Sequence, residues 1–151
     1  RDNLDIGVGA GLTNSYGVPL IMPMGFLKWN ITGPYEVNVE VAGSMKASVS
    51  RVFSDRFRLS LVPMDMDGMS AVVKQNGDYK IYGVTRMRAY IRPEYKIGKK
   101  SYIYTEIGTD LYHTVKMSDR SYKGFINAFK GDDSWEFGQA FHIMAGFKYG
   151  F

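Results

Sequence analysis

The second half of the sequence alternates between apolar and charged residues at every second position. The pattern covers residues 79–97, 101–116 and 135–151, where eleven side chains with a formal charge stand at even positions and none at odd positions. A period of two is that of a β-strand with two different faces, whereas a helix would scatter the charges around its axis. The pattern therefore predicts an antiparallel sheet with one apolar and one charged face.

Shorter segments repeat the alternation with less contrast, at residues 4–12, 27–31, 35–41, 45–50 and 57–61. With the three long segments they give eight predicted strands. Tight turns are predicted at Thr32-Gly33-Pro34, Ser54-Asp55 and Gly98-Lys99-Lys100, because these residue types favour turns.

The remaining connections are long and irregular, at residues 14–21, 64–78 and 117–134, with a brief Gly43-Ser44 turn as the exception. Tight turns then fall at one end of the sheet and long loops at the other. This arrangement is typical of an all-β, antiparallel up-and-down transmembrane β-barrel of about eight strands, with the long loops 64–78 and 117–134 outward.

Composition limits the other possibilities. A chain of 151 residues that is 45% hydrophobic and 23% charged fits a single folded domain over residues 1–151. Its net charge of +4 includes no basic run, so no nucleic-acid partner is predicted. The absence of cysteine excludes disulfides, thiolate metal sites and a cysteine nucleophile. Prolines interrupt the longest apolar stretch, residues 18–27, which is too short for a membrane helix. No cofactor or metal is predicted.

Alternation alone does not say which face is buried, because soluble ligand-binding barrels alternate too. The last strand favours the membrane interpretation, since apolar residues occupy every second position from Phe141 to the C-terminal Phe151. The long strands exceed the roughly 9 to 11 residues that span a bilayer. Aromatic residues near strand ends fit interfacial girdles. We therefore expect a bacterial outer-membrane location, with contact to outer-membrane lipid and recognition by the barrel assembly machinery through the strand ending in Phe151.

Four segments carry a resemblance to a known family. They are Tyr16-Gly17-Val18-Pro19, residues 39–52 with the Ser54-Asp55-Arg56 turn, Tyr95-Lys96-Ile97-Gly98-Lys99, and Gly146-Phe147-Lys148-Tyr149-Gly150-Phe151. The chain resembles an uncharacterised Bacteroidota outer-membrane β-barrel family, classed as a domain of unknown function, over most of its length. Members of that family have further strands ahead of this region, so the resemblance implies that the chain is the C-terminal eight strands of a wider barrel. It supplies no active site.

The two histidines, His113 and His142, are the catalytic candidates, because outer-membrane lipases and acyltransferases combine His with Ser, Asp or Glu. The alternation places His113 on the apolar face, which favours an interfacial role. It places His142 on the charged face with Glu136 and Lys148, which favours a structural network. The sequence therefore favours a non-enzymatic protein, with a lipid-modifying enzyme as an alternative.

The strongest local charge bias is the cluster Arg86, Arg88 and Arg92 on one strand. In a lumen it could bind or select anions, which would make the protein a porin-like pore or transporter. Carboxylates on the same face are numerous enough to neutralise it, and an eight-stranded barrel is filled by its own side chains. The sequence therefore favours an internal ion-pair network and a structural or interaction role, with an Arg-lined pore as the alternative if the barrel is wider.

Two weaker motifs predict no ligand site. Residues 7–11 contain three glycines, but Leu12 follows them and the segment alternates as a strand. Asp65-Met66-Asp67-Gly68 resembles the start of a calcium loop, yet Asn76 stands where that loop needs Glu.

Pro93 interrupts a predicted strand and predicts a β-bulge there.

Overall fold

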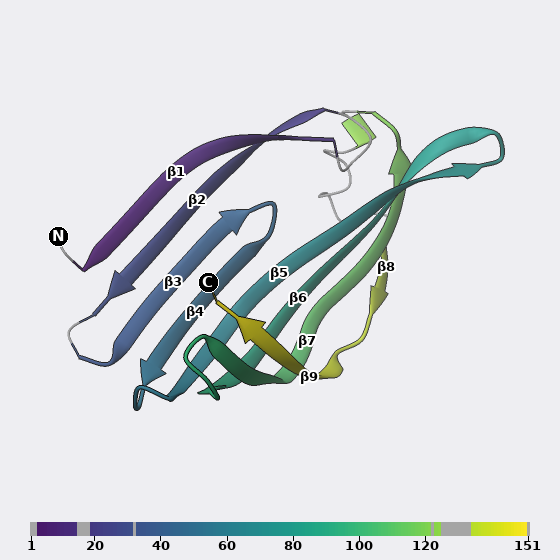
Figure 1. The fold of residues 1–151 in the computed structure, drawn as a ribbon. Helices are drawn as coiled ribbons and strands as arrows, with labels where there is room; N and C mark the ends of the chain where they lie inside the picture. The colour runs from purple at the N-terminus through teal and green to yellow at the C-terminus, as the bar shows by residue number, and fades with distance from the viewer. Residues whose placement is uncertain (1–2, 15–18, 32, 122, 125–133, 151) are drawn as a thin grey trace.

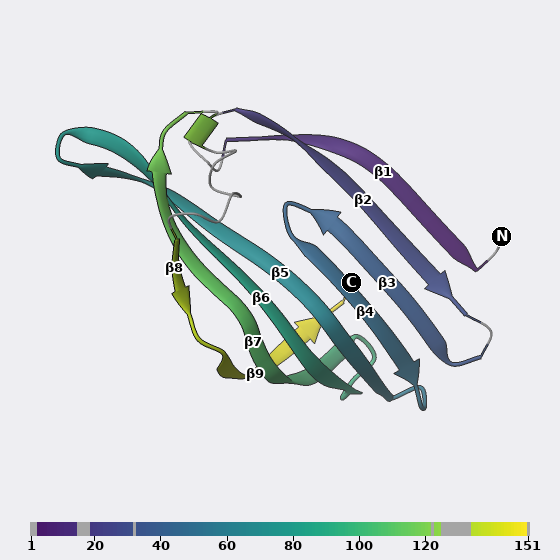
Figure 2. The same cartoon turned by 180° about the vertical axis from the view of Figure 1, so that it is seen from behind.

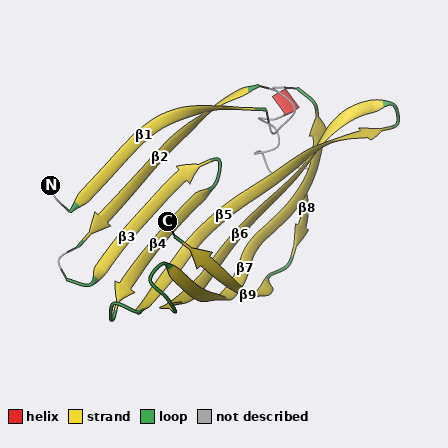
Figure 3. Ribbon diagram, in the orientation of Figure 1, coloured by secondary structure: helices red, strands yellow, loops and turns green. Residues whose placement is uncertain are grey.

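The structure is a computed structural model of the chain, and it describes all residues except 1–2, 15–18, 32, 122, 125–133 and 151 (Figure 1). Strands make up most of the described part (Figure 3). They are β1 (Leu4–Thr13), β2 (Leu20–Asn30), β3 (Tyr35–Ala42), β4 (Met45–Val52), β5 (Phe57–Gln75), β6 (Asp78–Lys96), β7 (Ser101–Asp119), β8 (Ser134–Phe137) and β9 (Ala140–Tyr149). No helix in this part is long and apolar enough to cross a membrane.

All nine strands form one antiparallel sheet in which sequence neighbours pair from β1 to β7, so the predicted up-and-down order is confirmed. β8 and β9 both pair with β7, β8 along residues 113–116 and β9 along residues 101–110. Together they replace the single last strand that was predicted, because the strand is interrupted at Gly138-Gln139.

The sheet is not closed. Within the described residues β1 pairs only with β2, and β9 pairs only with β7, so the two edges do not meet (Figure 1). The prediction of a closed barrel of about eight strands is therefore wrong for this sheet. Opposite views show a sheet curved about an open interior (Figure 2).

The tight turns predicted at Ser54-Asp55 and Gly98-Lys99-Lys100 lie between β4 and β5 and between β6 and β7, and the brief Gly43-Ser44 turn joins β3 to β4. Thr32 of the turn predicted at Thr32-Gly33-Pro34 lies outside the described residues. Gly43 has a φ of 80°, a left-handed backbone conformation that glycine adopts readily because it has no Cβ. The predicted loop 64–78 is wrong, because β5 and β6 continue through these residues to a two-residue turn at Asn76-Gly77. Both turn residues have positive φ, at 51° and 94°, as a tight hairpin requires. Most of the other predicted long loop, 117–134, lies outside the described residues.

Register shifts change which face a residue occupies. In β5 a shift between Val62 and Asp65 places one extra residue in the strand, and in β7 a shift lies opposite Met87 and Arg88. Each such shift reverses the odd and even faces beyond it. Pro93 lies between two β6–β7 pairs of the same register, so the bulge predicted there does not occur.

The two faces of the sheet differ as the alternation predicted over most of its area. Apolar side chains on the outer face are exposed, including Val8 at 91% and Phe141 at 74%. The inner face holds most of the buried residues, both apolar, as Val62 and Tyr90, and charged, as Glu94 and Glu106. The sheet thus has a polar interior and an apolar exterior.

Candidate functional site

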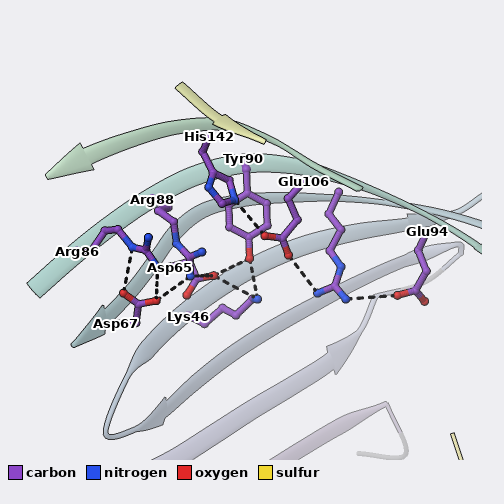
Figure 4. A network of polar contacts seen from close by, with 10 residues as sticks. Lys46, Asp65, Asp67, Arg86, Arg88, Tyr90, Glu94, Glu106 and His142 are labelled. Carbon is purple, nitrogen blue, oxygen red and sulfur yellow. Dashed lines mark hydrogen bonds and ion pairs between the residues drawn. The ribbon is translucent and has the colours of Figure 1, made fainter. Parts of the chain in front are cut away.

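A network of ion pairs covers the inner face across β4, β5, β6, β7 and β9, and Figure 4 shows its charged side chains pointing toward one another. The strand register explains how they meet. Lys46, Asp65 and Arg88 are cross-strand partners in one row, and Asp67 and Arg86 form the next pair. Directly opposed side chains in antiparallel strands lie within reach of one another.

Asp65 is the centre of the first half of the network. Its Oδ2 accepts hydrogen bonds from the Tyr90 hydroxyl at 2.6 Å, from Arg88 Nη2 at 3.3 Å and from Lys46 Nζ at 3.4 Å. Lys46 Nζ also donates to the Tyr90 hydroxyl at 2.8 Å. Arg88 Nη2 donates to Asp67 Oδ2 at 2.9 Å, and so joins the two aspartates.

The Asp67 carboxylate also accepts hydrogen bonds from Nε and Nη2 of Arg86, at 3.4 Å and 3.3 Å, in a bidentate contact. The two arginines therefore face two carboxylates of β5, and their charge is balanced locally. The sequence pattern did not reveal these partners, because residues 64–78 were predicted to form a loop. The Asn76-Gly77 pair was the available signal, since Asn-Gly is a strong indicator of a two-residue hairpin.

Arg92 is held less tightly than the other two arginines. Its Nη2 and Nη1 lie 3.8 Å from Glu94 and Glu106, which is longer than a hydrogen bond. Its guanidinium lies over the Tyr104 ring, 3.9 Å from the centroid, at a cation–π distance. Its Nε is buried with no hydrogen-bond partner in the described structure.

His142 faces inward as predicted. Its Nε2 lies 3.3 Å from Oε2 of Glu106, a side chain that is 4% exposed, and its ring is 5.8 Å from that of Tyr90. Among the described residues it contacts no hydroxyl placed as a nucleophile would be. His142 therefore joins the ion-pair network through Glu106.

His113 lies on a different face from the one predicted. The register shift in β7 pairs it with Arg86 of the inner face and, on the other side, with Phe137 of β8. Its ring packs 4.9 Å from the Phe137 ring. The prediction assumed an unbroken alternation from residue 101 to residue 116, which the extra residue at Leu111 interrupts.

A hollow of about 460 Å³ lies beside the network on the inner face. Short polar side chains form part of its lining, namely Asn38, Ser48, Ser50 and Ser60, and the Ser50 and Ser60 hydroxyls are 2.8 Å apart. Longer charged side chains surround them: Lys28, Glu36, Glu40, Lys46, Arg58, Arg92, Glu94 and Lys148. Within the described residues no cluster of three His, Asp or Glu side chains could hold a metal ion, and Asp65 and Asp67 of the calcium-like motif face arginines.

Another ion pair lies away from the network, toward the Asn76-Gly77 end of β6 and β7. Lys80 Nζ donates to Asp119 Oδ1 at 2.5 Å between β6 and β7. The hydrogen bond from Lys80 lowers the pKa of Asp119 below its ordinary value, and the same contact raises the pKa of Lys80. Both groups are exposed, so the pair is open to screening by salt.

These features define a class: an all-β, antiparallel up-and-down sheet with an apolar outer face and a charged inner face. A family model described as "Domain of unknown function (DUF6268)" matches residues 1–150, and the chain belongs to this family. No curated protein and no solved structure matches the chain.

Proposed function

We propose that this sheet is part of the wall of a bacterial outer-membrane β-barrel with a structural or interaction role. The observation that carries the proposal is the opposition of its two faces. Large apolar side chains are exposed on the outer face, while the ion pairs are gathered on the inner face. A sheet surrounded by water would be expected to bury the apolar face instead.

Lipid on the outside makes this arrangement favourable. Transfer of an apolar side chain from water to lipid is favourable by about 25 cal/mol per Å² of surface buried. The charged side chains of the inner face remain outside the hydrocarbon. β1, β2 and β9 have 10 or 11 residues, which matches a tilted bilayer span. The 19-residue strands β5, β6 and β7 are longer than a span and would extend past the membrane.

The open edges bear on the size of the barrel. An unpaired strand edge costs several kcal/mol per unsatisfied group in hydrocarbon, so a membrane sheet must close. Since β1 and β9 do not pair with each other, we propose that further strands close the wall, as in the wider Bacteroidota barrels that the sequence resembles. The aromatic last strand is the segment that we propose the assembly machinery recognises.

A second candidate is a pore, which the open sheet favours because a wider barrel leaves a lumen. In that case Arg86 and Arg88 are poor selectivity elements, because Asp65 and Asp67 balance them. Arg92 is the arginine of the cluster with the weaker pairing. Planar-bilayer recordings of the purified protein test this candidate: discrete conductance steps support it, and their absence in folded protein removes it.

Membrane location can be tested with single-cysteine variants, because the chain has no cysteine of its own. Val39 and Asn38 are neighbours in β3 on the outer and inner face. In intact outer membranes, Val39→Cys should resist a charged maleimide and react with a lipid-soluble one, whereas Asn38→Cys should react with the charged reagent. Migration on SDS gels with and without boiling checks folding in the same samples. Equal labelling of both cysteines by the charged reagent contradicts the proposal.

A further inference from the structure

The hollow on the inner face has the size and lining of a small-molecule site. Its volume of about 460 Å³ falls within the roughly 300–1,000 Å³ of ligand pockets. The space exists because Asn38 and three serines stand in the strands between longer charged residues. Hydroxyl and amide groups in the lining can both donate and accept hydrogen bonds.

The charge of the lining favours an anion. Five of its side chains are basic, Lys28, Lys46, Arg58, Arg92 and Lys148, and three are acidic, Glu36, Glu40 and Glu94. Lys46 is engaged with Asp65 and Arg58 pairs with Glu36 at 3.3 Å, so these two cations are occupied.

Three of the five cations have capacity left: Lys28, which makes no ion pair within the described residues, and the neighbouring pair Arg92 and Lys148. Arg92 and Lys148 both approach the same Oε2 atom of Glu94 at 3.8 Å, so one carboxylate serves two cations without hydrogen-bond contact to either. The second partner of Arg92, Glu106, also lies 3.8 Å away and is shared with His142. Arg92 Nε is buried without a partner, although a guanidinium carries five N–H donors.

Contact with an aromatic ring limits the movement of Arg92 before any ligand arrives. Its guanidinium lies over the Tyr104 ring, and its cross-strand neighbour is Ser60, whose hydroxyl contacts Ser50. A cation held in place in this way loses little conformational freedom on binding, and a guanidinium matches the planar geometry of a carboxylate.

We propose that the hollow binds a small organic oxyanion, a carboxylate or a phosphate, through Arg92 and Lys148. The serine and asparagine groups of the lining hold its remaining polar atoms. The ligand completes the coordination of two cations that Glu94 alone leaves incomplete. This site does not depend on what surrounds the outer face, so it can fail or stand independently of the membrane proposal.

Calorimetric titration of the purified, folded protein at low ionic strength tests the site, with citrate and inorganic phosphate as separate probes. Saturable binding of citrate alone identifies a carboxylate site, and binding of phosphate identifies a phosphate site. Arg92→Gln and Lys148→Gln should each weaken binding about tenfold, since hydrogen bonds to charged groups have that effect.

Lys96→Gln is the matched control, because it removes one positive charge from the same strand as Arg92 at a position outside the hollow. It should leave the affinity within about twofold. Arg92→Lys keeps the charge and guards against loss of folding in Arg92→Gln. Absence of saturable binding to the folded wild-type protein overturns the proposal, as does equal weakening by Lys96→Gln and Lys148→Gln.

Discussion

Replacing Asp65 by Asn should destabilise the sheet more than the replacement of an exposed charged residue. The Asp65 and Arg88 side chains are only 10% and 12% exposed, so the substitution leaves a buried guanidinium and a lysine facing a neutral amide. Removing one partner of a buried ion pair costs about 3–5 kcal/mol. Arg88 keeps Asp67 at 2.9 Å, and Lys46 is exposed enough to be hydrated, so we expect the lower end, about 3 kcal/mol.

The assay is equilibrium unfolding in guanidinium chloride of protein reconstituted in detergent or lipid, followed by fluorescence of Trp29 and Trp135. Asp119→Asn is the control, because it removes a carboxylate from an exposed pair and should shift the unfolding midpoint far less. The reasoning is refuted if Asp65→Asn and Asp119→Asn unfold at the same midpoint with the same slope.

Three further predictions follow from local geometry. Gly108→Ala should lower the free energy of unfolding by about 1–3 kcal/mol, because a Cβ there overlaps the Ala89 carbonyl and the Tyr90 backbone. Gly9→Ala meets open space and should be tolerated, so a similar denaturant midpoint for the two variants would contradict the overlap at Gly108. If folded protein migrates differently with and without boiling on SDS gels, as the membrane proposal expects, deletion of Pro63 should abolish the difference, because it turns Asp65 and Asp67 to the apolar face. Pro63→Ala keeps the residue count and should retain the difference. The pKa of the Asp119 carboxyl, measured by NMR, should lie below its ordinary value of 3.8, and Lys80→Met should raise it. Because the pKa is lowered in the folded state, the stabilisation by this pair is present above the ordinary pKa and is lost as the pH falls through the folded-state pKa. An unchanged Asp119 pKa in Lys80→Met would exclude the contact.

Strand positions and faces could be predicted wherever the alternation is uninterrupted. The Arg92 region of β6 and the His142 region of β9 face inward, as the parity of the sequence required. Local residue types also located most of the turns, because glycine, proline and asparagine limit the backbone conformation.

The remaining features of the fold and of the site depend on β-bulges and on edge pairing, which the alternation of apolar and charged residues does not reveal. One extra residue near Pro63 brings Asp65 and Asp67 to the arginines, and one at Leu111 turns His113 inward. Each bulge reverses the assignment of every residue beyond it. Closure was also beyond the alternation, because edge pairing is a property of the whole sheet and not of any one strand.

The two free edges differ from each other, and this determines how copies of the chain would associate away from a membrane. β1 and β9 run in opposite directions in the sheet, so the β9 edge of one molecule can pair antiparallel with the β1 edge of the next. Such a contact joins two different surfaces, so it lacks the two-fold symmetry that would stop at a dimer. Growth is head-to-tail and ends only if a ring closes. Protein produced in water without lipid or detergent is therefore expected to form filaments.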